Sequence, residues 1–176
     1  MKLWTHKKLR TNIIALFFLI STFAFGQSPA PDTSGLSPHT IAMYNGLFEK
    51  EWSRKFVDEW NAIPDSARVL KGMGAVRFVS VGAESVSTIM SFDSTGKAWL
   101  PGSGGVFLMT ADSIPTFTAK LEKWAEFMEG KFNAVAGVLT KKISYKGPFT
   151  LAIKYGFQFN KVAPVGKRIA EALHKK

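Results

Sequence analysis

Apolar side chains recur every three or four positions between residues 39 and 63, which is the spacing of an amphipathic helix. Trp52, Phe56 and Trp60 lie on this stripe, and charged residues fill the positions between them. Pro64 follows at the point where such a helix has to end. The pattern therefore predicts one long helix over residues 39–63, whose large aromatic face we expect to be buried in the core.

The period of the pattern then changes from 3.6 to 2, which is typical of strands. Alternating segments separated by turn residues predict strands near residues 76–81, 86–92 and 97–100, joined as an antiparallel meander. A further apolar segment, residues 106–111, predicts a fourth strand. Because apolar residues fall on both faces of several strands, we expect the sheet to be covered on both faces or to hold something apolar on the second.

Helical spacing returns over residues 112–128, where Asp112 can cap a helix and Pro115 would lie in its first turn. Residues 132–139 predict a short second helix, and residues 143–145 predict a fifth strand. The remaining chain is apolar and aromatic, with Pro and Gly before a last amphipathic turn. A mixture of helices and short strands of this kind predicts the α+β class.

The N-terminus has the three parts of a secretory signal peptide: four basic residues, an apolar run over residues 13–25, and small residues up to Gly26. An apolar run of 13 residues is shorter than the roughly 20 that a membrane-spanning helix needs. We therefore expect residues 1–26 to be cleaved and the product to be periplasmic or secreted, with a retained anchor as the alternative. Residues 27–38 predict a flexible leader, and residues 39–176 a single domain.

Composition excludes several classes of protein. The chain has 176 residues, of which 46% are hydrophobic, so it can bury a core, and it has no cysteine. Disulfide scaffolds, cysteine-ligated metals, cysteine nucleophiles and a lipidated cysteine are thereby excluded. The two histidines after the signal, His39 and His174, lie near opposite ends of the sequence, and no metal-ligand spacing or serine-hydrolase motif occurs. We expect no catalytic residue, no metal and no cofactor, and an unrecognised enzyme remains the less favoured alternative.

The net charge of +10 is unevenly distributed. Four positive charges belong to the signal peptide, residues 27–140 carry −2, and residues 141–176 carry nine basic residues and one acid. An exported protein rarely meets nucleic acid, so an anionic membrane is the better partner for this basic segment. We expect Lys141, Lys142 and Lys146 to face the membrane, with a merely solvated basic face as the alternative.

One stretch is similar to a known family. Gly130-Lys131-Phe132-Asn133 follows an amphipathic helix, and a short helix then leads to Ile143-Ser144-Tyr145-Lys146-Gly147. This order resembles the G-K-L-N-P, helix, G-K-L-K-I-x-G segment of the sterol-carrier-protein-type-2 domain family, and the resemblance covers residues 75–155. Ala134 stands where that family usually has Pro, and Lys141-Lys142 replaces its Gly-Lys.

The resemblance implies a five-stranded, mostly antiparallel sheet covered by helices, with an apolar tunnel that holds a sterol, a fatty acyl chain or an isoprenoid-like lipid. Family members carry such lipids without chemistry, and some are accessory modules of enzymes. A 14-methylene tail costs about 11 kcal/mol when exposed to water, so a carrier needs a dry cavity of at least a few hundred Å³. The aromatic and aliphatic residues that we expect to line it are Phe78, Met90, Phe107, Met109, Phe117, Leu121, Trp124, Phe132, Leu139, Leu151 and Tyr155. An accessory or interaction module of the cell envelope is the alternative function.

Overall fold

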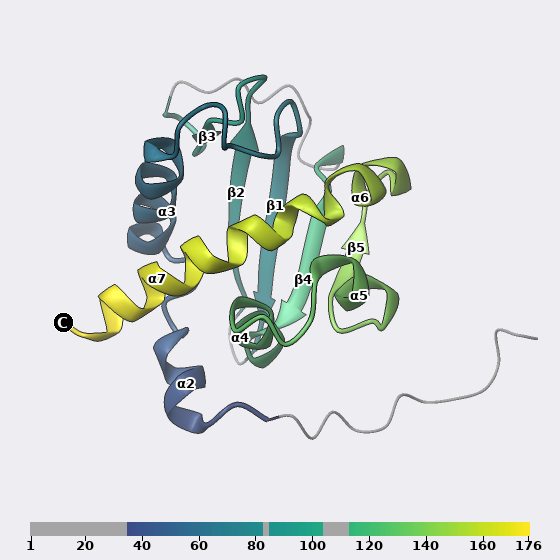
Figure 1. Ribbon diagram of the computed structural model, residues 1–176. Coiled ribbons are helices and arrows are strands. Elements are labelled where there is room, and N and C mark those ends of the chain that lie inside the picture. The colour runs from purple at the N-terminus through teal and green to yellow at the C-terminus, as the bar shows by residue number, and fades with distance from the viewer. Residues whose placement is uncertain (1–34, 83–84, 104–112) are drawn as a thin grey trace, which may run out of the picture. The chain divides into compact units, whose positions relative to one another are not determined.

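The computed structural model describes residues 35–82, 85–103 and 113–176. These residues form an α+β unit in which helices pack against a five-stranded sheet (Figure 1). The expected signal peptide, most of the expected leader and the expected strand at residues 106–111 lie outside the described residues.

The sheet is built around a central strand, β1 (Gly74–Val81). On one side β2 (Val86–Phe92) pairs with β1 and β3 (Ala98–Trp99) pairs with β2, both antiparallel. On the other side β4 (Thr116–Lys120) runs parallel to β1, and β5 (Ser144–Lys146) is antiparallel to β4. The order is β3-β2-β1-β4-β5. Only the β1–β4 pair is parallel, so the sheet is mixed and mostly antiparallel, as expected.

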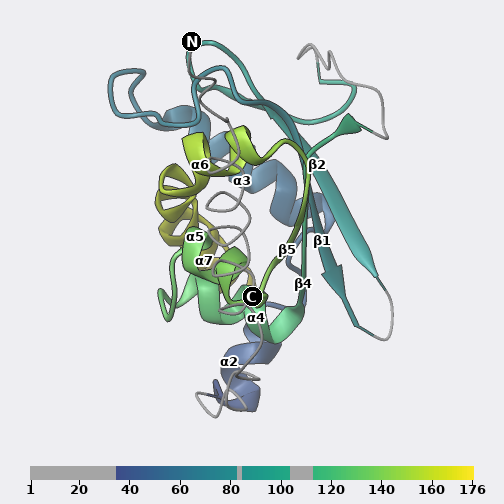
Figure 2. The same cartoon turned by 90° about the vertical axis from the view of Figure 1, so that its right-hand side faces the viewer.

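The helices lie on one face of this sheet (Figure 2). Strand alternation directs Phe78 and Met90 to that face, where both are buried, while Val79 and Ile89 on the opposite face are half-buried. Among the described residues the helices cover one face only, so the expected cover of both faces is not found there. The interior of the unit lies between this face and the helices.

The N-terminal helical segment is two helices, and the prediction of a single helix was wrong. Helix α2 (Pro38–Met43) begins at a Ser37 cap, and α3 (Lys50–Ala62) follows a turn in which Phe48 has a φ of 74°. Apolar spacing alone did not reveal the break, although Gly46 in the turn is a poor helix former. The turn buries Phe48 together with the aromatic stripe of α3.

The helix expected over residues 112–128 was also wrong in its first half. Residues Thr116–Lys120 are strand β4, and helix α4 occupies only Leu121–Met128. Thr116, Phe117 and Thr118 are β-branched or aromatic, which favours a strand. Pairing begins where the Arg77 amide donates to the Pro115 carbonyl at 2.8 Å. Phe117 is therefore a strand residue that points into the core.

The C-terminal part supplies most of the helical cover. Helix α5 (Ala134–Leu139) is capped by the side chain of Asn133, and α6 (Phe149–Gly156) follows strand β5. A short 3-10 helix, η2 (Gln158–Lys161), leads directly into α7 (Val162–His174), which crosses in front of the sheet in Figure 1. Pro164 lies in the first turn of α7, where proline is tolerated, so α7 is longer than the predicted final turn.

Candidate functional site

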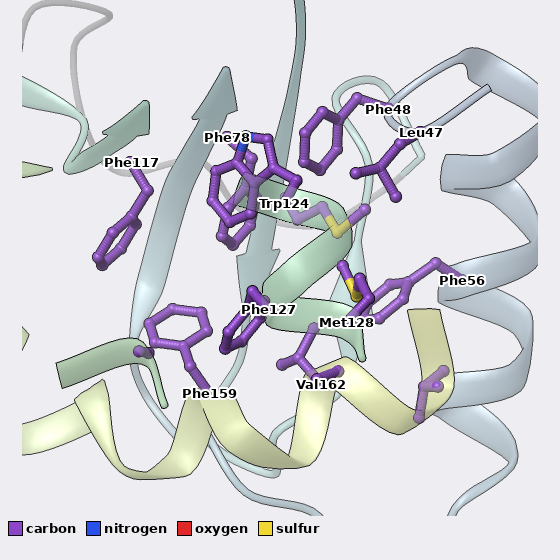
Figure 3. Close-up of a cluster of buried hydrophobic side chains, with 14 of the residues drawn as sticks. Leu47, Phe48, Phe56, Phe78, Phe117, Trp124, Phe127, Met128, Phe159 and Val162 are labelled. Carbon is purple, nitrogen blue, oxygen red and sulfur yellow. The ribbon is translucent and has the colours of Figure 1, made fainter. Parts of the chain in front are cut away.

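A cavity lined only by apolar side chains lies between the sheet and the helices. Figure 3 shows Phe78 and Trp124 pointing toward the same interior as Phe127 and Phe159, from different elements. The lining combines the aromatic stripe of α3 with side chains from the sheet, α4, α5, η2 and the start of α7: Phe48, Trp52, Phe56, Phe78, Met90, Phe92, Phe117, Trp124, Phe127, Met128, Ala134, Ile143, Phe159 and Val162.

Aromatic rings fill most of this interior. The Phe78 ring is stacked on Phe117 at a centroid distance of 6.0 Å and on Phe48 at 6.1 Å. The rings of Trp124 and Phe159 approach Phe78 edge-on at 6.0 and 5.8 Å. The cavity that remains is about 30 Å³, enough for one or two water molecules, whereas a lipid tail needs a few hundred Å³. Among the residues that the structure describes, the lining side chains occupy the space between sheet and helices and leave no open tunnel there.

Two tryptophans of this lining, Trp52 and Trp124, have buried indole N–H groups. Trp124 Nε1 donates to the Val79 carbonyl at 2.9 Å, which ties α4 to the sheet. Trp52 Nε1 is buried and has no hydrogen-bond partner among the described residues. A buried donor without a partner costs about 1–3 kcal/mol, so Trp52 is a polar group that a ligand oxygen could satisfy.

The structure brings together four of the residues that the sequence nominated. Phe78, Met90, Phe117 and Trp124 line the cavity, and their contact with a ligand stays a prediction. Leu121, Phe132 and Leu151 are half-buried and pack around the core without lining this cavity, while Phe107 and Met109 lie outside the described residues.

Two residues that were expected to line the cavity, Tyr155 and Leu139, do not line it. Tyr155 is fully buried, and its hydroxyl donates to the Lys71 carbonyl at 3.1 Å, so it fastens α6 to the turn before β1. Leu139 is 72% exposed, so its nomination as a residue of the interior was wrong. It ends α5 at the surface, because α5 packs on the core through its Ala134 and Gly137 face.

The sequence did not predict the cavity-lining residues on α3, at the end of α4, in η2 and at the start of α7. Trp52 and Phe56 were assigned to the ordinary core, and Phe127, Phe159 and Val162 were not singled out. The signal that could have found the first two was the density of large rings on one stripe of α3. Nothing local distinguishes Phe159 or Val162 from other core residues.

Another pocket, of about 60 Å³, lies between α5 and α6. Its rim carries exposed apolar side chains: Leu139 at 72%, Phe149 at 66% and Ile153 at 59% of their full exposure. Phe117 lies in the lining of this pocket as well as in the lining of the central cavity. The expected membrane-facing lysines flank the same two helices, Lys141 and Lys142 after α5 and Lys146 before α6.

The polar groups form no metal-binding cluster in the part of the chain that the structure describes. That part contains no group of three or more His, Asp or Glu side chains able to hold a metal ion. His39 and His174, far apart in sequence, pack edge to face with ring centroids 5.0 Å apart. Across residues 35–82, 85–103 and 113–176, every helix is too short or too polar to span a bilayer.

Comparison with known proteins identifies the fold. No family model and no curated protein matches the sequence. The structure is similar to a crystal structure of sterol carrier protein 2, with a TM-score of 0.51 and 16% identity over 68% of this chain and 96% of that one. A Thermus thermophilus protein described as possibly sterol carrier protein aligns with a TM-score of 0.47 and 14% identity over 70% of this chain and 89% of that one. The chain therefore has the fold of sterol carrier protein 2.

Proposed function

We propose that this protein binds a single hydrophobic lipid, a sterol, a fatty acyl chain or an isoprenoid-like molecule, and carries it without chemical change. The observation that supports this proposal is the cavity of Phe, Trp and Met side chains between sheet and helices, in a fold shared with a sterol carrier protein. No catalytic residue takes part in the proposal.

The closed cavity has to widen before a lipid enters. The rings around Phe78 are held by ring contacts worth about 0.5–1.5 kcal/mol each rather than by hydrogen bonds. Met90 and Met128 are flexible and adjust to ligands of different shape. A tail of 14 methylenes gains about 11 kcal/mol on leaving water, which is enough to offset the separation of several rings.

The unpaired indole of Trp52 suggests how a polar group of the ligand is held. Its Nε1 has no partner among the described residues, and a hydroxyl or carbonyl oxygen on the lipid would satisfy it once the cavity has widened enough to expose this atom. The unpaired donor favours a lipid with a small oxygen-bearing end over a pure hydrocarbon.

The basic C-terminal segment is proposed to dock on an anionic membrane. Residues 141–176 contain nine basic residues and one acidic residue, Glu171. Lysine near an anionic leaflet contributes about 1 kcal/mol, so Lys141, Lys142 and Lys146 together contribute about 3 kcal/mol. The proposal places the protein outside the cytoplasm, after cleavage of residues 1–26.

Binding is tested by native mass spectrometry and thermal unfolding of residues 27–176 with oleate, cholesterol and a polyprenol added separately. We expect a 1:1 complex with at least one of them and a midpoint of unfolding that rises with ligand concentration. The absence of both effects with all three lipids would overturn the proposal.

A groove between α3 and β2 favours the alternative, an interaction module. It has a volume of about 760 Å³ and a mixed lining that includes Arg54, Asp58, Thr88 and Leu100. Such a lining suits a peptide segment better than a lipid tail. Co-elution with an envelope protein in a fixed ratio, lost on changing Arg54 and Asp58 together to Ala, would support this alternative.

A further inference from the structure

We infer that the lipid enters the central cavity by passing between α5 and α6. It comes from a bilayer that contacts the surface formed by these two helices, and the ring of Phe117 is the gate. The inference rests on the proposed lipid-binding function and adds the route of access. Phe117 is the side chain that separates the central cavity from the surface pocket.

Phe117 occupies the position that a gate requires. Its ring lines the central cavity on one side and the pocket between α5 and α6 on the other, and Ala134 is shared between the two in the same way. Phe117 itself is only 5% exposed. Rotation of one ring beside a small residue would therefore join the two spaces.

The Phe117 ring is held in place by contacts with three other rings. It lies 4.7 Å from Tyr145 and 5.1 Å from Phe159, measured between centroids, in tilted or edge-on contacts, and it is stacked on Phe78 at 6.0 Å. The Tyr145 hydroxyl donates to the Pro148 carbonyl at 2.9 Å, so Tyr145 is held by the loop that leads into α6. Movement of α6 would displace Tyr145 and free the Phe117 ring.

The exposed side chains around this pocket favour a bilayer as the partner of this surface. Phe149 and Ile153 lie one turn apart on α6, and Leu139 at the end of α5 lines the same pocket. Lysines follow α5, precede α6 and occur within α6, and acidic residues are absent from this stretch of sequence. Exposed apolar side chains bordered by lysines are complementary to acyl chains beneath anionic head groups.

A reversible crosslink tests the route. A Cβ placed on Gly156 would lie 2.7 Å from Cγ2 of Val135, so cysteines at these positions are within reach of a disulfide that fastens α6 to α5. The chain has no other cysteine, so the Val135→Cys/Gly156→Cys variant is its own control when reduced. The measurement is the rate at which a fluorescent C18 fatty acid moves into the protein from vesicles of phosphatidylcholine and phosphatidylglycerol.

We expect the oxidised variant to take up the probe at least about tenfold more slowly than the reduced variant, with dithiothreitol restoring the rate. Ala152→Trp, which plugs the same pocket without a crosslink, should slow uptake similarly. Equal rates for the oxidised and reduced forms, or for Ala152→Trp and the unmodified protein, would overturn the route. Failure of the unmodified protein to take up the probe would instead overturn the proposed function.

The contact of this surface with a bilayer is tested with the double variant Phe149→Ser/Ile153→Ser. Both changes lie at exposed positions. We expect slower uptake from anionic vesicles and an unchanged affinity for the probe in solution. If the variant instead converts a dimer to a monomer, the patch belongs to a second copy of the chain and the inference fails.

Discussion

The Tyr44 hydroxyl donates a hydrogen bond of 2.8 Å to Oε1 of Glu129, across 85 positions of sequence. The other oxygen of the same carboxylate, Oε2, accepts from Lys167 Nζ at 2.7 Å. The carboxylate thus joins the turn before α3 to the end of α4 and to α7. Burial of Tyr44 raises the pKa of its phenol, and the bond to Glu129 raises it further, so this hydroxyl stays a donor at neutral pH.

Glu129→Gln is expected to make stability less dependent on pH. Burial raises the pKa of Glu129, but hydrogen bonds from Lys167 and Tyr44 and the charges of Lys167 and Lys131 outweigh it, so the pKa lies below its usual 4.5. The carboxylate therefore stabilises the fold above pH 4.5, and this contribution is lost as the pH falls through the lowered value. We expect the variant to lose about 1–2 kcal/mol at pH 7, since solvent screens the pair, and less at pH 3.

Urea unfolding at a series of pH values measures this difference in the free energy of unfolding. Glu51→Gln is the matched control, because its contacts to Lys55 and Lys176 are longer, 3.8 and 3.9 Å, and lie on the surface. A loss for Glu129→Gln that is the same at pH 3 and pH 7 would contradict the assignment.

Gly137→Ala is expected to destabilise the protein by about 1–3 kcal/mol. A Cβ at Gly137 would lie 2.6 Å from Cε2 of Phe132 and 3.1 Å from Cδ1 of Ile143, so either α5 or these two side chains would have to move. Gly46→Ala is the control, since the nearest atom to its added Cβ is the Glu49 carboxylate at 3.9 Å. Chemical denaturation of the two variants compares them, and equal stabilities would show that α5 can shift freely.

A brominated fatty acid is expected to quench the fluorescence of the cavity tryptophans. Trp52 and Trp124 line the cavity, whereas Trp60 and Trp99 do not. Because bromine quenches on contact, Trp52→Phe/Trp124→Phe should remove most of the quenching, while Trp99→Phe should leave it nearly unchanged. Quenching that disappears in the Trp99→Phe variant would place the ligand elsewhere.

Changing Lys141, Lys142 and Lys146 together to Gln is expected to weaken binding to phosphatidylglycerol vesicles about 100-fold, since each charge contributes about 1 kcal/mol. Added salt should weaken binding of the unmodified protein in the same direction. Vesicle sedimentation measures both effects. The control changes Lys50, Arg54 and Lys55 on α3 to Gln, and an equal loss in the control would show that only total charge matters.

Local signals predicted the short helix α5 and strand β5 well. Helix α5 begins two residues after the expected start and ends where expected, and strand β5 lies one residue from its expected place, because capping and turn residues act over a few positions. Strand β4 was missed because Asp112 and Pro115 imitate the start of a helix, while the strand that stabilises Thr116–Lys120 lies almost 40 residues earlier, where Arg77 is the partner of Thr116. The closure of the cavity depends on how distant rings such as Phe48 and Phe159 meet Phe78, and no local pattern encodes that.

The parallel pairing of β1 with β4 also has a consequence for the order in which the chain folds. The β1–β2 hairpin closes over a few residues, whereas bringing Thr116 beside Arg77 requires closure of a loop of 116 − 77 = 39 positions. Longer loops cost more entropy and form more slowly. We expect pulsed hydrogen exchange during refolding to protect the amides of β1 and β2 before those of β4 and β5. The two halves of the sheet that forms one wall of the cavity would then be assembled at different times, so Phe78 would lack its contact with Phe117 until β4 arrives.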